Sequence, residues 1–422
     1  MALERAPGAA DRAVLVARYA QVRAATTALA AGLSAEDAQV QSMPDASPTK
    51  WHLAHTTWFF ETFLLVPNAE GYTPFDPDFG YLFNSYYEAV GPRHARPARG
   101  LITRPSMERV LAYRAHVDAA MAAMLAALPD AALAGVEPLV TLGFHHEEQH
   151  QELILMDIKH AFSCNPLEPA FRERTNPAPA TATPLGWIPV EGGLRRIGQD
   201  GGGFAFDNEG PRHKVWLEPF AIADRLTTAA EYAAFIADGG YRRPEFWLSD
   251  GWATVQDESW TAPLYWHEDA PGDWSVFTLE GRRPLDPAEP VCHLSFYEAD
   301  AFAHWSGARL PTEAEWEVAA EASAPTSAAL HLHPEAAPVG EGLRQAIGEV
   351  WQWTASAYLG YPGFKPAAGA VGEYNGKFMS GQMVLRGGAC VTPPGHARTT
   401  YRNFFPPSAR WAFSGVRLAR DA

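Results

Sequence analysis

The sequence changes its pattern near Gly186, and this change constrains the fold more than any other feature. Before Gly186, apolar residues recur at helical spacing in four segments, at residues 12–32, 48–65, 106–128 and 136–162. This pattern is typical of a four-helix bundle. Beyond Gly186, Gly and Pro interrupt short apolar runs. Trp51 and Trp58 are the only Trp residues before Gly186, so 12 of the 14 follow it. The second half is therefore predicted to be a loop-rich α+β domain stabilised by buried aromatic side chains.

Composition sets the predicted domain boundaries. We expect a bundle over residues 1–173, a linker over 174–185 and a second domain over 186–422. The linker contains TNPAPATATP, with three Pro and no large apolar side chain, which favours an extended chain. A chain of 422 residues is long enough for two cores. Within the second domain, helices are predicted at 227–237, 295–306 and 312–322.

Charge and cysteine content limit the classes of partner. The formal net charge of −16 disfavours nucleic acid and anionic membranes as partners. No run of 18 apolar residues without charge and no signal-peptide pattern is found. Cys164, Cys292 and Cys390 lie far apart, as in a reducing compartment. We therefore expect a cytoplasmic protein without nucleic-acid or membrane partners, and the sequence leaves its oligomeric state open.

The strongest chemical signal is the sequence HEEQH at residues 146–150. His146 and His150 are four residues apart, so both imidazoles lie on one face of the predicted helix. His55, on the predicted second helix, could supply a third imidazole in the bundle core. Three His ligands would leave positions open for substrate and O₂, as in iron oxygenases. The alternative is that hydrogen bonds satisfy these histidines. We interpret the neighbouring His52 and His145, on other faces, as structural.

The same motif matches the H-E-x-x-H pattern of zinc proteases, in which Glu147 would be the general base. Such proteases need a third ligand downstream. Here Asn165, Pro166 and Pro169 end the helix soon after the motif, and the metzincin extension is absent. The sequence therefore disfavours a protease.

A long connection separates the second and third predicted helices, from Pro67 to Pro105. Connections of this length in compact domains are usually functional or disordered. This one contains FNSYY at 83–87 and the basic run RHARPAR at 93–99. We favour a functional loop, although a solvated surface run is the alternative for Arg93 and Arg96.

Taken in order, these motifs resemble those of the ergothioneine sulfoxide synthases. That family joins a DinB-like four-helix bundle to an α+β domain of the formylglycine-generating-enzyme and C-type-lectin-like fold. In the first half the resemblance rests on LAH at 53–55, GPRHAR at 91–96 and HEEQH at 146–150. In the second half it rests on GWIPV at 186–190, RLPTEAEWE at 309–317, GEVWQWT at 348–354, LRGG at 385–388 and GVRL at 415–418. Several of these are fold signatures and support the architecture more than the activity.

The resemblance implies an enzyme that uses iron(II), with O₂ as co-substrate. It would join a thiol, cysteine or γ-glutamylcysteine, to the imidazole ring of hercynine (trimethylhistidine) and form a sulfoxide. By resemblance, iron is held by His55, His146 and His150. Gln149 would contact hercynine, and the second domain would complete the substrate pocket. Arg93 and Arg96 would hold the carboxylate of the thiol substrate, because guanidinium groups bind carboxylates through two hydrogen bonds.

The segment YRNFF at residues 401–405 is similar to the strip that covers the hercynine pocket in this family. Asn403 could bond a carboxylate. Phe404 or Phe405 could face the trimethylammonium group in a cation–π contact. The alternative is that both phenylalanines fill the core.

A proton donor is expected on the long loop. The phenol of Tyr87 or Tyr86 could act as a general acid. We prefer Tyr87 and expect the other tyrosine to be buried packing. Tyr358 and Tyr361 are alternatives in the second domain.

Other functions remain open from the sequence. A related enzyme could use a selenium donor, as in selenoneine synthesis, or histidine itself, as in an ovothiol-type reaction. A ligand-binding protein without catalysis is another possibility, because a fold does not fix a function. The second domain contains Cys292 and Cys390 without paired spacing, which disfavours copper-dependent formylglycine chemistry.

Overall fold

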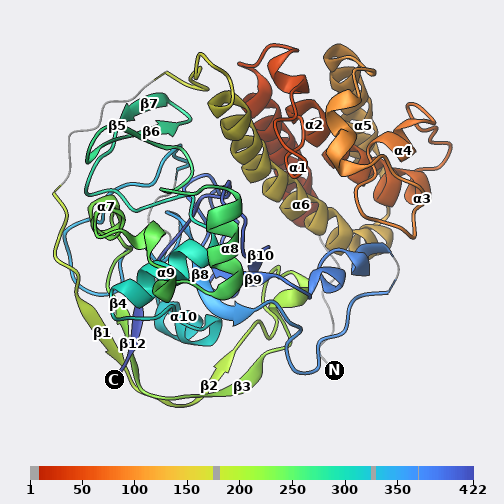
Figure 1. Ribbon diagram of the computed structural model, residues 1–422. Helices are drawn as coiled ribbons and strands as arrows, with labels where there is room; N and C mark the ends of the chain where they lie inside the picture. The colour runs from red at the N-terminus through yellow and green to blue at the C-terminus, as the bar shows by residue number, and fades with distance from the viewer. Residues whose placement is uncertain (1–8, 174–180, 325–328, 369) are drawn as a thin grey trace. The chain divides into compact units, whose positions relative to one another are not determined.

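The computed structural model describes residues 9–173, 181–324, 329–368 and 370–422 (Figure 1). The chain divides into two compact units. Unit 1 contains Met1–Cys164 together with the distant segment Ala368–Tyr374, and unit 2 contains Asn165–Ala367 and Asn375–Ala422. Of the predicted linker, residues 174–180 lie outside the described residues, and 181–185 form neither helix nor strand. The domain boundaries at 173 and 186 stay a prediction.

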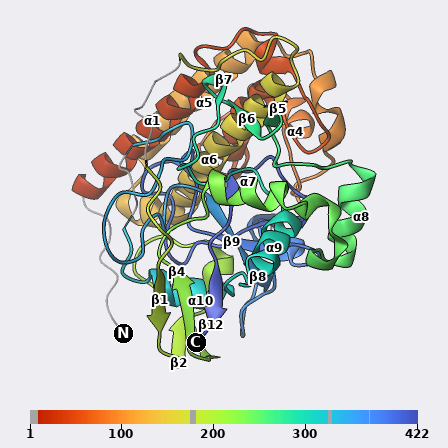
Figure 2. The same ribbon diagram turned by 60° about the vertical axis from the view of Figure 1, so that its left-hand side comes forward.

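Unit 1 is built on the expected four long helices. They are α1 (Ala9–Ala30), α2 (Thr49–Phe60), α5 (Met107–Ala127) and α6 (Asp130–Ser163). Helices α1 and α2 both pack against α6, and α2 also packs against α5 (Figure 1). Figure 2 shows α1, α5 and α6 from another side. Helix α6 begins earlier than predicted, at Asp130, with Pro138 inside it. The long connection contains α3 (Val66–Asn68) and α4 (Phe79–Leu82), and a π-helical turn, Glu61–Leu65, continues α2.

Helix α2 is the central element of the bundle, because all 12 of its residues are buried. An ion-pair network in the bundle core connects α2 to the other three long helices. The Glu147 carboxylate on α6 pairs with Arg114 on α5 and with Arg23 on α1, the latter at 2.9 Å. Arg23 also donates to the Thr57 hydroxyl on α2 at 2.9 Å. One buried carboxylate thus connects the four long helices, and removing it would leave buried guanidinium groups without their counter-charge.

By length and composition, α5 is the one helix in the described part of the chain that could cross a membrane. It packs against α2 and α1 in the bundle. The core helix of a bundle passes the same test, so this is weak support for a membrane span.

The described residues of unit 2 form short strands in four small sheets. Their orders are β1-β4-β12, β10-β9-β8-β11, β2-β3 and β5-β6-β7. Strand β11 pairs with β8 in parallel, and the other pairs between these strands are antiparallel. The strands are β1 (Trp187–Val190), β2 (Gly193–Ile197), β3 (His213–Leu217), β4 (Phe220–Ala223), β5 (Trp266–Ala270), β6 (Asp273–Thr278), β7 (Gly281–Pro284), β8 (Trp351–Ala357), β9 (Met383–Arg386), β10 (Asn403–Phe405), β11 (Ser414–Gly415) and β12 (Ala419–Asp421).

The three helices predicted for the second half are confirmed as α7 (Ala229–Ala237), α9 (Phe296–Trp305) and α10 (Glu313–Ala320). Each begins with a capping box, in which Thr228, Ser295 or Thr312 bonds the backbone N–H of a Glu three residues later and that Glu bonds back. Helix α8 (Ser249–Asp257) was not predicted, because it is polar and contains Gly251.

The fold-signature motifs of the second half meet in the core of unit 2. The Gln352 side-chain oxygen accepts hydrogen bonds from Trp316 Nε1 and Arg417 Nε, both at 2.7 Å. The buried guanidinium of Arg386 pairs with Glu317. The motifs that contain these residues therefore hold the domain together. Together the bundle and this strand-containing unit give the expected α plus α+β fold.

Candidate metal centre

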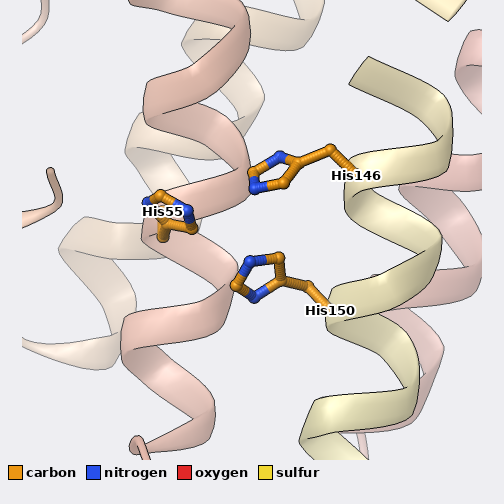
Figure 3. A group of neighbouring side chains, drawn as sticks. All are labelled: His55, His146 and His150. Atoms are coloured by element: carbon orange, nitrogen blue, oxygen red, sulfur yellow. The ribbon is translucent and has the colours of Figure 1, made fainter. Parts of the chain in front are cut away.

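Three histidines converge in the core of unit 1. His55 projects from α2, while His146 and His150 lie one turn apart on α6 and point toward α2 (Figure 3). One ring nitrogen from each lies within 4.8 Å of the others. The ring centroids of the three pairs are 4.7–5.0 Å apart. The structure thus brings together the three residues that the sequence analysis chose as ligands.

The ring nitrogens of this group are arranged as metal ligands would be. His55 Nδ1 lies 2.6 Å from the Phe83 carbonyl oxygen, which can only accept, so the proton is on Nδ1 and Nε2 carries the lone pair. His55 Nε2 and both ring nitrogens of His146 are buried without a hydrogen-bond partner among the described residues. Such atoms are rare in proteins. Burial lowers the pKa of His146 to about 3, so its imidazole is neutral.

This donor set fits a divalent transition metal. Three neutral imidazoles can hold iron(II) or zinc and leave further positions for a substrate. No carboxylate of the described residues belongs to this group. The ligand atoms therefore support a metal centre without choosing the metal.

Stacked aromatic rings fix the orientation of His55. The Trp51 ring lies parallel to the His55 ring, with centroids 4.5 Å apart and an interplanar angle of 13°. Trp58 also stacks on His55 at 5.5 Å. The Arg99 guanidinium covers the Trp51 ring at 3.4 Å and donates to two serine hydroxyls. The ring orientation of His55 is thus set by packing as well as by its hydrogen bond.

Tyr87, the preferred proton donor, lies one aromatic ring away from His55, and Tyr86 lies beyond it. Tyr87 is buried, and its ring is 5.6 Å from Trp58. Its hydroxyl has no partner within the part of the chain that the structure describes, and burial raises its pKa well above the usual value. Tyr86 is half-buried, 5.4 Å from Tyr87.

Arg93 and Arg96 lie on the exposed side of the long loop. The Arg93 Nε is 2.9 Å from the Glu88 carboxylate, and the side chains are 37% and 62% exposed. Arg96 donates to the backbone carbonyl of Asp45. Both guanidinium groups therefore have weak, solvent-accessible partners that a carboxylate could replace. Arg99, in the same run, is buried instead.

Tyr374 is a candidate functional residue that the sequence analysis missed. It lies in the segment Ala368–Tyr374, which belongs to unit 1 although it follows much of unit 2 in sequence. Its hydroxyl donates to Oε1 of Gln149, and its ring is 5.7 Å from that of His146. The neighbouring Glu373 accepts from two backbone N–H groups of the long loop, at 2.9 and 3.0 Å. The sequence around it, GEYNG at residues 372–376, has no periodic pattern, so it gave no indication that Tyr374 lies near the histidines.

The interpretation of His52 needs a correction. His52 was expected on another face, but its Nδ1 lies 2.8 Å from His150 Nδ1 and its Nε2 lies 3.0 Å from the Asp157 carboxylate. Residues three apart on a helix are neighbours on its surface, so His52 and His55 both face α6. His145 pairs with Glu148 at 3.1 Å.

The environment of Glu147 argues against the protease alternative. Burial alone would raise its pKa, but Arg114 and Arg23 lower the pKa to about 2. The carboxylate is fully buried and paired with both arginines. A carboxylate with a lowered pKa that two arginines already engage is a poor general base for a metal-bound water.

In unit 2, the predicted hercynine strip forms β10 and pairs with β9. Phe404 stacks on Tyr358 at 4.0 Å and 11°, and Phe405 packs on Trp411 at 5.4 Å. The Asn403 side-chain oxygen accepts from the Phe404 N–H at 2.9 Å. All three strip residues are half-buried. Of the two alternative tyrosines, Tyr358 accepts from Asn208 and Tyr361 donates to Glu313, so both hydroxyls are already bonded.

Comparison with known proteins identifies the families to which the two halves of the chain are similar. Residues 18–156 match the DinB superfamily, and residues 172–422 match the sulfatase-modifying factor enzyme 1-like domain. The chain is 33% identical to the hercynine oxygenase of Mycolicibacterium smegmatis, over 92% of this chain and 94% of that protein. The chain belongs to the hercynine oxygenase family.

A second family member, the hercynine oxygenase of Mycobacterium tuberculosis, is 32% identical over 96% of this chain and 98% of its own length. The formylglycine-generating enzyme of Streptomyces coelicolor is 27% identical, over 60% of this chain and 95% of its own length. The hercynine oxygenases are thus matched over both halves. The chain is an enzyme of the hercynine oxygenase family.

Proposed function

We propose that this hercynine oxygenase family member uses iron(II) and O₂ to join the sulfur of a thiol to the imidazole ring of hercynine. One C–H and one S–H bond break, one C–S bond forms, and the sulfur gains one oxygen atom. The second oxygen atom leaves as water, so O₂ accepts all four electrons. The observation that carries this proposal is the convergence of three buried imidazoles in a chain 33% identical to a hercynine oxygenase.

His55, His146 and His150 would hold the metal. When bound there, iron(II) would supply the redox chemistry that O₂ requires. The chain supplies the geometry, because the Phe83 carbonyl and the Trp51 ring fix the ring of His55. Buried aromatic side chains around the triad exclude water from this group.

Gln149 and the strip Asn403–Phe405 would recognise hercynine. Gln149 is half-buried, directly before a proposed ligand. Phe404 is half-buried and stacks on Tyr358, and the face of an aromatic ring attracts a trimethylammonium group. The contact would contribute roughly 0.5–2 kcal/mol.

Arg93 and Arg96 would hold the carboxylate of the thiol substrate. Arg93 would exchange the exposed Glu88 carboxylate for that of the substrate, which costs little because exposed ion pairs are weak. The thiol would be cysteine or γ-glutamylcysteine.

A phenol would supply the proton that the reaction needs. The sequence favours Tyr87 or Tyr86. Tyr374 is a third candidate, because its ring contacts His146 and its hydroxyl is oriented by Gln149. A general acid must lie within hydrogen-bond reach of the reacting atoms, directly or through one water.

Mass spectrometry of the products tests this proposal. The purified full chain would receive iron(II), O₂ and hercynine, with cysteine, γ-glutamylcysteine or a selenosugar offered in parallel. We expect a sulfoxide of hercynine with one of the two thiols, and loss of the product when a chelator removes the metal. A selenium-containing product would identify selenoneine-type chemistry. A further reaction in which histidine replaces hercynine would identify the ovothiol type if product forms only there. Binding without turnover would overturn the proposal. Cytoplasmic location and small-molecule substrates as the only partners remain predictions.

A further inference from the structure

A series of hydrogen bonds between buried polar groups begins at Nδ1 of His150. His150 Nδ1 lies 2.8 Å from His52 Nδ1, and His52 Nε2 lies 3.0 Å from Asp157 Oδ2. The same carboxylate oxygen accepts from the Ser47 backbone N–H at 2.8 Å. Beyond it, the Ser47 hydroxyl accepts from the buried Arg99 at 2.9 Å. All of these side chains are at most 6% exposed, so solvent does not compete for the bonds.

The direction of each hydrogen bond in this series follows from the Asp157 carboxylate, which can only accept a hydrogen bond from His52. The Asp157 carboxylate is an acceptor, so the facing His52 Nε2 carries a proton. In a neutral imidazole the other nitrogen is then an acceptor, so His52 Nδ1 accepts. The proton between the two rings therefore belongs to His150 Nδ1. This leaves His150 Nε2 with a lone pair for the metal.

We propose that Asp157 and His52 are positioning residues that fix the tautomer and the ring orientation of His150, and so set the metal affinity of the triad. The proposal rests on the triad being the metal site. A ligating histidine is commonly oriented by a partner on its other nitrogen, and such partners tune the metal. Here the partner is a second histidine anchored by a carboxylate.

The three ligands are supported unequally, which makes the proposal specific. His55 has a backbone carbonyl on its Nδ1, and no partner for His146 is found among the described residues. His150 is the ligand whose hydrogen-bond partner on Nδ1 is a side chain, which can be substituted. Asp157 lies seven residues after His150, two turns along the same face of α6, and His52 on α2 spans the gap between them.

Metal titration of the full chain tests the proposal, with cobalt(II) as the probe under anaerobic conditions. We expect His52→Phe and Asp157→Leu to weaken cobalt(II) binding about 10- to 100-fold. Asp157→Asn should bind more nearly as the wild type does, because its amide oxygen can still accept from both His52 and Ser47. His160→Phe is the matched control. It removes another α6 histidine, one bonded to Ser42 at 2.7 Å, and should leave the affinity unchanged.

A second measurement does not depend on how the variants fold. Nitrogen-15 NMR of the histidines in zinc-loaded wild-type protein should show a protonated Nδ1 and a metal-bound Nε2 for His150. A protonated Nε2 or a metal-bound Nδ1 would overturn the proposal. So would equal cobalt(II) affinity for the wild type, His52→Phe and Asp157→Leu. If the wild type itself binds no metal, the metal site of the proposed function fails as well.

Discussion

The hydroxyl of Tyr374 donates a hydrogen bond to Oε1 of Gln149, a residue 225 positions earlier in the chain. Gln149 directly precedes His150, and the Tyr374 ring lies 5.7 Å from His146. A phenol from the second half of the sequence thus belongs to the surroundings of the histidine triad. Its orientation is fixed by a side chain that we also assign to hercynine binding.

Tyr374→Phe should change the outcome of the reaction more than the binding of its substrates. The substitution removes one oxygen atom and keeps the ring. General acid catalysis typically contributes about 10²- to 10⁴-fold, so sulfoxide formation should fall by roughly a hundredfold or more. Oxygen would then oxidise the thiol alone. The ratio of sulfoxide to oxidised thiol, measured by mass spectrometry, checks this expectation.

Three further substitutions distinguish the candidate donors. Tyr72→Phe is the matched control, because that hydroxyl donates to Glu61 and neither residue belongs to the proposed site, and it should keep the wild-type ratio. Tyr86→Phe and Tyr87→Phe test the long loop. If Tyr374→Phe keeps the ratio and one of these two lowers it, the donor is on the loop. If Tyr374→Phe, Tyr86→Phe and Tyr87→Phe all keep the wild-type ratio, none of these three phenols is the donor.

What the sequence could predict depended on local periodicity. Capping boxes at Thr228, Ser295 and Thr312 mark helix starts within four residues, and the predicted helices were found there. His146 and His150 share a helix face by their spacing alone. Such signals are complete within one turn of a helix.

The missed residues depend on contacts between segments that are far apart in sequence. The pairing of His52 with His150 spans 98 positions and requires the relative rotation of α2 and α6. Tyr374 reaches unit 1 from a segment of short 3₁₀ turns without a periodic pattern. A single sequence holds no local signal for either contact.

Arg93→Ala and Arg96→Ala should each weaken thiol binding roughly ten- to hundredfold. The loss of a charge-assisted hydrogen bond costs about 1.5–3 kcal/mol, which corresponds to this range. Binding of hercynine should change little, because we assign it to Gln149 and the strip Asn403–Phe405. Anaerobic titration with each substrate measures both affinities. Arg109→Ala removes another exposed ion pair, with Asp76, and should change neither. Unchanged thiol affinity in both loop variants would contradict the assignment.

Glu147→Gln should destabilise the bundle. The buried carboxylate pairs with Arg23 and Arg114, and breaking such a network typically costs about 3–5 kcal/mol because buried charge is left uncompensated. Urea unfolding of the metal-free protein measures the free energy of unfolding without a contribution from metal binding. The exposed Glu70→Gln should stay within about 0.5 kcal/mol of the wild type. Equal stability of the two variants would show that Glu147 is not a structural ion pair.

The stability of unit 2 should fall as the pH rises through a window set by Glu349. This side chain is 1% exposed, and burial raises its pKa from 4.5 to about 8. Between these values the folded chain holds a proton that the unfolded chain has released, so raising the pH favours unfolding. The loss amounts to at most about 5 kcal/mol, from 1.36 kcal/mol per pKa unit.

Glu349→Gln tests this dependence, because its amide mimics the protonated acid and can still accept from the Glu335 N–H. Near pH 5 the variant and the wild type should be similarly stable. Near pH 8 the variant should be the more stable of the two. Urea unfolding at both values gives the difference, and the exposed Glu341→Gln should show none. A gap between wild type and Glu349→Gln that stays constant between pH 5 and 8 would mean that Glu349 ionises in the folded protein at its ordinary pKa.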